Sequence, residues 1–214
     1  MSLDAIREAR VLPAVTIEKA ADAVPLASAL VDGGLRVMEV TLRTDAAADS
    51  IARIKDSDLD LLVGAGTILN PEDVRRAVEA GAAFGVSPGC SELVLREAQA
   101  LKLPMIPGVV TPTEIERAME LGYSFLKFFP AESSGGVKKV KALMGPYMHT
   151  GLRFMVTGGI NASNMGEYLA LPIVDAVCGS WFVNQRLIDS ASWSQVKEFA
   201  RGARDIAHQI KSAQ

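Results

Sequence analysis

The sequence predicts an α/β fold, a (β/α)8 TIM barrel of eight parallel strands with an extra N-terminal helix. Short runs rich in β-branched and apolar residues alternate with longer segments whose apolar residues recur at helical spacing. This unit repeats roughly every 25 residues along the whole chain. No Ser/Gly linker, charge block or change of composition divides the 214 residues, so we expect one (β/α)8 domain over residues 1–214.

The strands are expected where the β-branched and apolar runs lie, and strands that alternate with helices form a parallel sheet. The expected strands are Val11 to Ile17, Arg36 to Leu42, Asp60 to Thr67, Ala83 to Ser87, Pro104 to Pro107, Ser124 to Phe129, Leu152 to Thr157 and Asp175 to Gly179. The extra amphipathic helix is expected at Leu3 to Ala9. The alternative fold is an open, doubly wound sheet with a dinucleotide site. However, no G-x-G-x-x-G follows the first strand, and Gly64-Ala65-Gly66 lacks the third glycine.

The ends of several helices are marked by capping residues and glycines. A capping residue followed by proline and acidic residues favours a helix start, and this pattern occurs at Asn70-Pro71-Glu72-Asp73 and at Thr111-Pro112-Thr113-Glu114. Glycine just before the next strand favours a left-handed helix exit, and such glycines are Gly33-Gly34, Gly81 and Gly122.

Composition excludes several classes of function. With 22 Lys and Arg against 25 Asp and Glu, the formal charge is -3, so we expect neither a nucleic-acid partner nor an anionic membrane surface. Cys90 and Cys178 form no C-x-x-C pair and the only histidines are His149 and His208, so we expect no disulfide framework and no metal site. The charged first ten residues do not resemble a signal peptide, and no apolar run approaches the roughly 18 residues of a membrane span. We therefore expect a cytoplasmic protein.

A lysine stands in the middle of an apolar, aromatic strand. The run is Phe125-Leu126-Lys127-Phe128-Phe129-Pro130. Burial disfavours the charged form of an amine, and a neutral amine is a nucleophile that can form a Schiff base with a carbonyl substrate. The alternative is a structural lysine that reaches solvent at the strand end or pairs with an acid.

A second strand carries polar residues on one face. Glu39, Thr41 and Arg43 stand at i, i+2 and i+4, so their side chains share a face. If that face points into the barrel, it supplies a carboxylate for proton transfer and a guanidinium that can bind a substrate carboxylate. A structural Glu39–Arg43 ion pair is the alternative. The presence of Lys127 in another strand favours the functional interpretation.

Glycines end the last two strands. Thr157-Gly158-Gly159 follows the seventh strand and Gly179-Ser180 the eighth, where many barrels of this type bind phosphate through backbone N–H groups. Read singly, each glycine pair is only a turn, but together they favour a phosphate site. Thr67 and the Ser87-Pro88-Gly89 turn end the third and fourth strands and are expected near the same mouth.

These strand ends carry a set of motifs in a fixed order. The motifs are Glu39-Val40-Thr41-Leu42-Arg43-Thr44, Val63-Gly64-Ala65-Gly66-Thr67, Val86-Ser87-Pro88-Gly89, Lys127-Phe128-Phe129-Pro130-Ala131-Glu132, Thr157-Gly158-Gly159-Ile160 and Gly179-Ser180-Trp181. Over nearly the whole chain the sequence resembles the class I 2-keto-3-deoxy-6-phosphogluconate (KDPG) aldolases, a family that includes 4-hydroxy-2-oxoglutarate (KHG) aldolases. One departure is that Met155-Val156 stand where members often have Cys-Pro.

The resemblance implies a Schiff-base aldolase that cleaves KDPG reversibly to pyruvate and glyceraldehyde 3-phosphate in the Entner–Doudoroff pathway. Lys127 would form the Schiff base and Glu39 would be the general acid/base. No metal or organic cofactor is implied, and members are typically homotrimers. The other implied contacts are Arg43, Thr67 and Thr157 for the substrate, Pro88 and Phe129 for the pocket walls, and Gly158, Gly159, Gly179 and Ser180 for the phosphate.

Several alternatives stay open at the level of sequence. The substrate could be 4-hydroxy-2-oxoglutarate or the 6-phosphogalactonate epimer, because all three share the keto-acid half. A phosphosugar isomerase or epimerase on the same barrel would use Glu39 as base and Lys127 as an electrostatic clamp. A non-catalytic phosphosugar-binding module would use the glycine loops alone.

Overall fold

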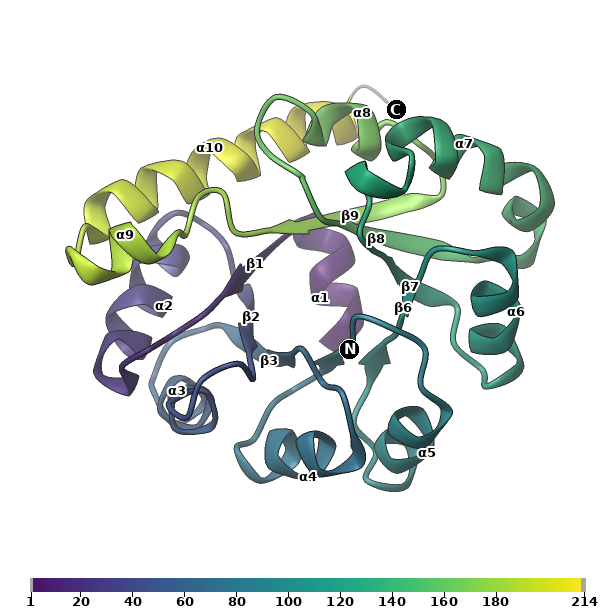
Figure 1. Cartoon of the computed structure of the whole chain (residues 1–214). Coiled ribbons are helices and arrows are strands. Elements are labelled where there is room, and N and C mark those ends of the chain that lie inside the picture. Colours follow the sequence, from purple (N-terminus) through teal and green to yellow (C-terminus); the bar gives the residue numbers. More distant parts are fainter. Residues whose placement is uncertain (1, 213–214) are drawn as a thin grey trace.

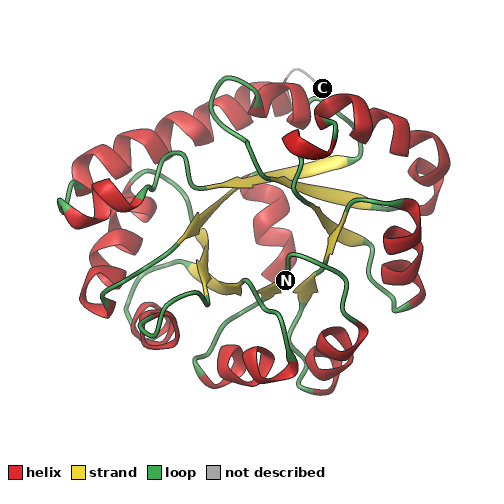
Figure 2. Ribbon diagram, in the orientation of Figure 1, coloured by secondary structure: helices red, strands yellow, loops and turns green. Residues whose placement is uncertain are grey.

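The computed structural model describes residues 2–212 and consists of a ring of parallel strands surrounded by helices (Figures 1 and 2). The predicted parallel (β/α)8 barrel is confirmed. The strands are β1 (Val11–Val15), β2 (Val37–Thr41), β3 (Leu62–Gly66), β4 (Gly85–Val86), β5 (Met105–Ile106), β6 (Gly108–Val109), β7 (Phe125–Phe128), β8 (Arg153–Thr157) and β9 (Val174–Gly179).

The helices cover the outside of this ring, except for α1, which lies across one open end of it (Figure 1). The predicted extra N-terminal helix is therefore confirmed. The helices are α1 (Ser2–Ala9), α2 (Ala23–Asp32), α3 (Ala47–Lys55), α4 (Pro71–Glu79), α5 (Glu92–Ala100), α6 (Pro112–Glu120), α7 (Gly136–Tyr147), α8 (Met165–Leu169), α9 (Gln185–Asp189) and α10 (Trp193–Ser212). No helix among residues 2–212 has the length and apolar character needed to cross a membrane.

The barrel closes at its fifth strand, which is split into two halves. The strand order is β5-β4-β3-β2-β1-β9-β8-β7-β6, so the two ends of the sheet are consecutive in the chain. Pro107 separates them, and its carbonyl accepts a hydrogen bond from the Lys127 amide at 2.8 Å. The prediction that this strand ends at Pro107 was wrong. Proline has no N–H to donate, so it interrupts the strand, which continues as β6.

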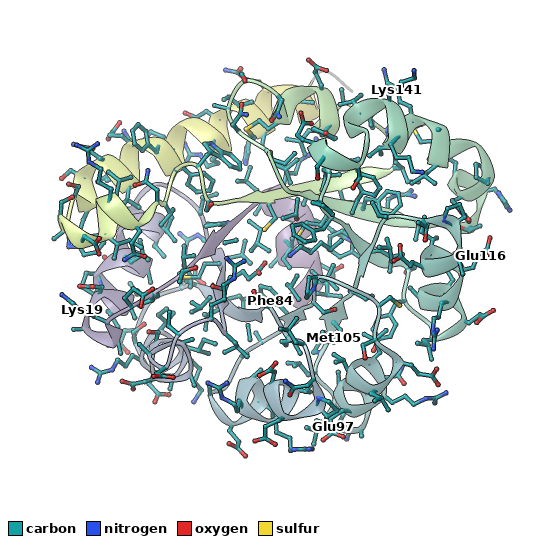
Figure 3. The ribbon with its side chains drawn as sticks, in the orientation of Figure 1. Lys19, Phe84, Glu97, Met105, Glu116 and Lys141 are labelled. Carbon is teal, nitrogen blue, oxygen red and sulfur yellow. The ribbon has the colours of Figure 1, made fainter. Side chains whose placement is uncertain are left out.

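Two layers of apolar side chains hold the barrel together. One layer fills the space between the strands and the outer helices, and includes Met38, Val40 and Ala65. The other lies inside the barrel and includes Val37 and Phe84, with Ile6 of α1 packed against it. Figure 3 shows Phe84 within the ring of strands, whereas Glu97, Glu116 and Lys141 lie on the outer helices at the edge of the molecule. Successive strand residues therefore face helices and interior in turn.

The predicted helix ends are confirmed except at Gly33, whose φ is -76°, so that Gly34 alone makes the left-handed exit there. The Asn70 side chain accepts from the Asp73 N–H at the start of α4, and Thr111 and Glu114 form a capping box at the start of α6. Gly34, Gly81 and Gly122 all have positive φ, at 87°, 80° and 87°. These short, firmly ended connections bring the chain back to the barrel after each helix.

Candidate active site

A cavity of about 420 Å³ opens at the end of the barrel where the strands terminate. This is the end at which barrel enzymes place their sites. Every residue that the sequence singled out for the site lines this one cavity. These residues are Glu39, Arg43, Thr67, Pro88, Lys127, Phe129, Thr157, Gly158, Gly159, Gly179 and Ser180.

Lys127 extends from β7 into the cavity and is 7% exposed. Within residues 2–212 its side chain makes neither a hydrogen bond nor an ion pair, and its Nζ lies 4.9 Å from the centre of the Phe129 ring. The structural alternative, in which a carboxylate neutralises this lysine, is therefore wrong. A buried amine without a carboxylate partner, facing a cavity, is placed to attack a carbonyl carbon.

Glu39 extends from β2 into the same cavity and is 1% exposed. The alternation predicted for β2 is confirmed, because Glu39, Thr41 and Arg43 all line the cavity. No Glu39–Arg43 ion pair forms between these residues, both of which are described. The carboxylate occupies space over Gly66, where a Cβ would lie 1.9 Å from Glu39 Oε1. Glycine at this position of β3 makes room for the acid.

Arg43 and Thr67 form the rim of the cavity beside Glu39. Arg43 Nε donates to Thr67 Oγ1 at 3.2 Å, and the Arg43 side chain is otherwise open to solvent. Thr67 adopts a left-handed backbone conformation, with φ of 59°. A guanidinium at a cavity rim, with donors to spare, can bind a carboxylate in a bidentate pair.

Another part of the cavity wall is formed by the turns after β4 and β7. Phe129 and Pro88 line the cavity there. β6 packs closely against the Pro88 turn, since a Cβ on Gly108 would lie 2.1 Å from the Pro88 carbonyl oxygen. Glycine in the split fifth strand thus lets that turn approach the cavity.

The loop after β8 is held against the loop after β7. The amides of Ala131 and Glu132 donate to the carbonyls of Thr157 and Gly158, at 2.8 and 3.1 Å. Tyr168 donates to Glu132, and burial together with the Glu132 charge raises the pKa of this phenol, so it stays a donor. The loop after β7, the strand that carries Lys127, and the glycine loop after β8 are therefore held in a fixed position relative to each other.

The glycine turns expose unpaired backbone donors. Gly158 and Gly159 have φ of 102° and 80°, which only glycine adopts readily. Within the described chain, the amides of Gly158, Gly159 and Ser180 donate to no protein group. Thr157 Oγ1 is buried at the same edge of the cavity, beside the Cys178 thiol. Grouped unpaired donors at one edge of a cavity suit an anionic, oxygen-rich ligand.

Some cavity residues were not predicted by the sequence analysis. Thr41 was placed on the polar face of its strand but was given no role. The sequence signal for the others is weak, because they are small, apolar or amide side chains with no chemistry of their own. The unpredicted residues are Ala14, Thr16, Thr41, Ile160, Val183, Asn184 and Gln185.

A barrel that places a buried amine, a buried carboxylate and a rim guanidinium in one cavity belongs to the class of barrel enzymes acting on small carbonyl substrates. The family model for KDPG and KHG aldolase matches residues 3–199, and the chain belongs to this family.

Individual relatives agree with the family model. The chain is 49% identical over 193 residues to a 2-dehydro-3-deoxy-phosphogluconate aldolase of Treponema pallidum, covering 90% of this chain and 91% of the relative. It is 43% identical over 193 residues to the KHG/KDPG aldolase of Escherichia coli, covering 90% of each chain. A KDPG aldolase of Legionella pneumophila, with pyruvate captured as a covalent carbinolamine intermediate, superimposes with a TM-score of 0.89 at 38% identity. That match covers 94% of this chain and 97% of the other.

Proposed function

We propose that this chain is a class I aldolase that reversibly cleaves KDPG to pyruvate and glyceraldehyde 3-phosphate through a Schiff base on Lys127. The observation that supports it best is the buried Lys127 amine, which has no ion-pair partner within residues 2–212 and shares a cavity with Glu39. Membership of the KDPG and KHG aldolase family supports the same reaction.

In the first half of the reaction, Lys127 Nζ attacks C2 of the keto acid to form a carbinolamine. Loss of the hydroxyl as water, with one proton taken from solvent and returned when the imine is later hydrolysed, gives a protonated imine, which acts as the electron sink. The Glu39 carboxylate takes the proton of the C4 hydroxyl, directly or through one water. The electron pair of the C3–C4 bond then moves toward the imine nitrogen, releasing glyceraldehyde 3-phosphate and leaving an enamine.

In the second half, Glu39 returns its proton to C3 of the enamine and regenerates the imine. Water then hydrolyses the imine, which frees pyruvate and restores the Lys127 amine. The proton that leaves the C4 hydroxyl thus ends on the pyruvate methyl group. Every step uses side chains already in the cavity, so the scheme requires no metal or organic cofactor.

The other cavity residues fit the two ends of this substrate. Arg43, with Thr67 as its hydrogen-bond partner, is positioned for the C1 carboxylate. Thr157 Oγ1 supplies a buried donor for an oxygen near C2. Pro88 and Phe129 enclose the carbon chain. The phosphate would bind at the glycine turns formed by Gly158, Gly159, Gly179 and Ser180. The amides of Gly158, Gly159 and Ser180, which donate to no protein group within residues 2–212, would be its donors there.

Borohydride trapping tests the Schiff base. Incubation with pyruvate and borohydride should add one reduced pyruvate to the wild type, located at Lys127 by peptide mapping. Lys127→Ala should lose both the adduct and turnover. Lys141→Ala, which removes an exposed lysine on α7, should keep both. An unmodified wild type, or an adduct on another lysine, would exclude Lys127 as the nucleophile.

A second substrate, 4-hydroxy-2-oxoglutarate, is favoured by the name KHG/KDPG aldolase carried by the Escherichia coli relative. Its cleavage would give pyruvate and glyoxylate by the same steps. Comparing kcat/KM for KDPG, its 6-phosphogalactonate epimer and 4-hydroxy-2-oxoglutarate would rank the three. An isomerase, an epimerase or a binding module would not trap pyruvate, so the borohydride experiment separates these alternatives from an aldolase.

We further propose that the chain is a single domain that works as a homotrimer in the cytoplasm, in the Entner–Doudoroff pathway. The assembly is supported by two exposed leucines. Leu69, just before α4, is 59% exposed, and Leu93, in the first turn of the neighbouring helix α5, is 70% exposed. Light scattering of the purified protein should give three times the 22.7 kDa chain mass. A monomeric mass would contradict the trimer and leave the proposed chemistry unaffected.

A further inference from the structure

The Glu39 carboxylate is held between two neighbours that are not charged. Gly66 leaves space for Oε1, and the Cys178 sulfur lies 3.6 Å from Oε2. Within residues 2–212 the Cys178 thiol is the only hydrogen-bond partner of this carboxylate. Cys178 is fully buried and does not line the cavity, but it interacts with the cavity residues Glu39, Lys127 and Thr157.

The strand register explains how residues of β2 and β9 meet. β1 lies between these two strands. Ala14 is the β1 neighbour of Glu39, and Leu12 is the β1 neighbour of Cys178. Cys178 therefore lies two residues closer to the α1 end of the barrel than Glu39 does. The small side chain of Ala14 leaves room for the carboxylate to pass over β1 and contact the sulfur from the cavity side.

The thiol can only be a donor in this contact. Burial, reinforced by the Glu39 charge, raises the pKa of the Cys178 thiol, and nearby Lys127 and Thr157 oppose the shift. The thiol therefore stays protonated, and its S–H donates to the carboxylate. The titratable groups facing the cavity from other strands and loops are Lys127 and Arg43. Neither forms an ion pair with Glu39 among the described residues, which leaves the orientation of the carboxylate to Cys178.

We propose that Cys178 is a positioning residue for proton transfer, which rests on the function proposed above for Glu39. The S–H group holds Oε2 and thereby fixes the carboxylate. Oε1, which has no hydrogen-bond partner among residues 2–212, is left to take the substrate proton and return it. A misplaced acid or base lowers the rate even when its chemistry is unchanged.

Deuterium exchange separates this role from the Schiff base. Pyruvate alone in D2O forms the imine on Lys127, and proton transfer by Glu39 then exchanges its methyl hydrogens, which NMR follows. In Cys178→Ala we expect exchange to slow about tenfold, because the carboxylate loses its only donor. Borohydride trapping of pyruvate on the same variant should stay at the wild-type level, because Lys127 is untouched.

Two further variants separate loss of the donor from loss of volume. Cys178→Ser leaves a void similar to that of Cys178→Ala but keeps a donor, so it should recover most of the exchange rate. Cys90→Ala removes the other thiol, which lies outside the cavity, and should exchange like the wild type.

Three outcomes would overturn the proposal. These are wild-type exchange in Cys178→Ala, equal slowing in the alanine and serine variants, and a parallel loss of trapping and exchange, which would indicate general damage to the site. A wild type that fails to trap pyruvate would be a different result, because it would remove the aldolase reaction itself and the positioning role with it.

Discussion

The two ends of the barrel interior are equally buried but chemically opposite. Toward α1 the interior is apolar, and Val37 and Phe125 are 0% and 3% exposed. Two residues further along the same strands stand Glu39 and Lys127, at 1% and 7% exposure. Burial is thus the same, while the side chains change from hydrocarbon to ionisable groups. In both β2 and β7, a distance of two residues separates the side chain that stabilises the barrel from the one that forms the site.

This contrast has a physical basis. Burying an ionisable group costs free energy that burying a valine or phenylalanine does not. A sequence that accepts this cost both at Glu39 in β2 and at Lys127 in β7, at the same end of the barrel, indicates a functional site there. Substitutions at the α1 end should therefore lower the free energy of unfolding and leave turnover unchanged. Substitutions at the cavity end should lower turnover and leave the fold intact.

The largest effect is expected at the cavity end, for Glu39→Gln. Turnover should fall by about 10²–10⁴-fold, the usual contribution of a general acid/base. Pyruvate should still be trapped on Lys127 by borohydride, because the amide occupies the same volume and leaves the amine in place. Steady-state kinetics and intact mass measure the two effects. Glu120→Gln, on the exposed end of α6, is the matched control and should change neither. Unchanged turnover in Glu39→Gln would remove this residue from the mechanism.

At the opposite end, Ile6→Ala should show the reverse pattern. Ile6 is fully buried and joins α1 to the interior core. Removing it should lower the free energy of unfolding by about 2–5 kcal/mol, as for other large-to-small core substitutions. Below the melting temperature, kcat and KM should stay within about twofold of the wild-type values. This change is far smaller than the roughly 10²–10⁴-fold loss expected when a general acid/base is removed. Urea unfolding and kinetics on one preparation would check both. A tenfold drop in kcat with the fold intact would show that the two ends are coupled.

Two glycines on β3, which lie two residues apart, allow the two ends of the interior to be compared within one strand. A Cβ on Gly64 would fall 2.2 Å from the ring of Phe84, and one on Gly66 would fall 1.9 Å from Glu39 Oε1. Gly64→Ala should mainly destabilise, by about 1–3 kcal/mol, because the packed ring cannot move aside. Gly66→Ala should mainly lower kcat, by about tenfold or more, because a displaced carboxylate loses its reacting geometry. The idea fails if both variants lose stability and activity in the same proportion.

Much of this arrangement could be predicted from the sequence. Alternation in β2 assigns Glu39, Thr41 and Arg43 to one face, and the apolar neighbours of Lys127 mark it as buried. Both patterns are local, so they can be recognised in the sequence without knowledge of the tertiary structure. The split of the fifth strand was missed because Pro107 interrupts the apolar run. Whether Gly108 and Val109 continue the strand beyond the proline depends on which neighbouring strands supply the hydrogen bonds.

The contacts that were missed are those that depend on the order of strands. Cys178 and Glu39 are 139 positions apart and meet only because β1 lies between β9 and β2 and presents a small side chain there. Asn184 and Gln185 reach the cavity from the connection after β9. Neither has a motif of its own, and periodicity carries no information about which loop folds over a barrel mouth.

The smallest effect is expected away from both ends of the interior, at the start of α6. Glu114 Oε2 accepts hydrogen bonds at 2.8 Å from the N–H groups of Val110 and Thr111 and from the Thr111 hydroxyl. Burial opposes these bonds, but together they lower the pKa of Glu114 from its ordinary 4.5. The stability gained from this carboxylate is therefore complete above that ordinary value and is lost as the pH falls through the lowered one.

Thr111→Ala removes the cap and one of these bonds, and should lower the free energy of unfolding by about 1 kcal/mol at neutral pH. The penalty should shrink in acid, where protonated Glu114 no longer attracts the donors. Thr113→Ala, on the exposed first turn of the same helix, should have little effect at either pH. Denaturant unfolding at pH 7 and at a pH well below 4.5, beyond the lowered pKa of folded Glu114, would measure this. A Thr111→Ala penalty that stays constant between the two would mean that the hydroxyl cap alone, without Glu114, sets the start of this helix. Because α6 lies outside the ring of strands, kcat should be unchanged in both variants.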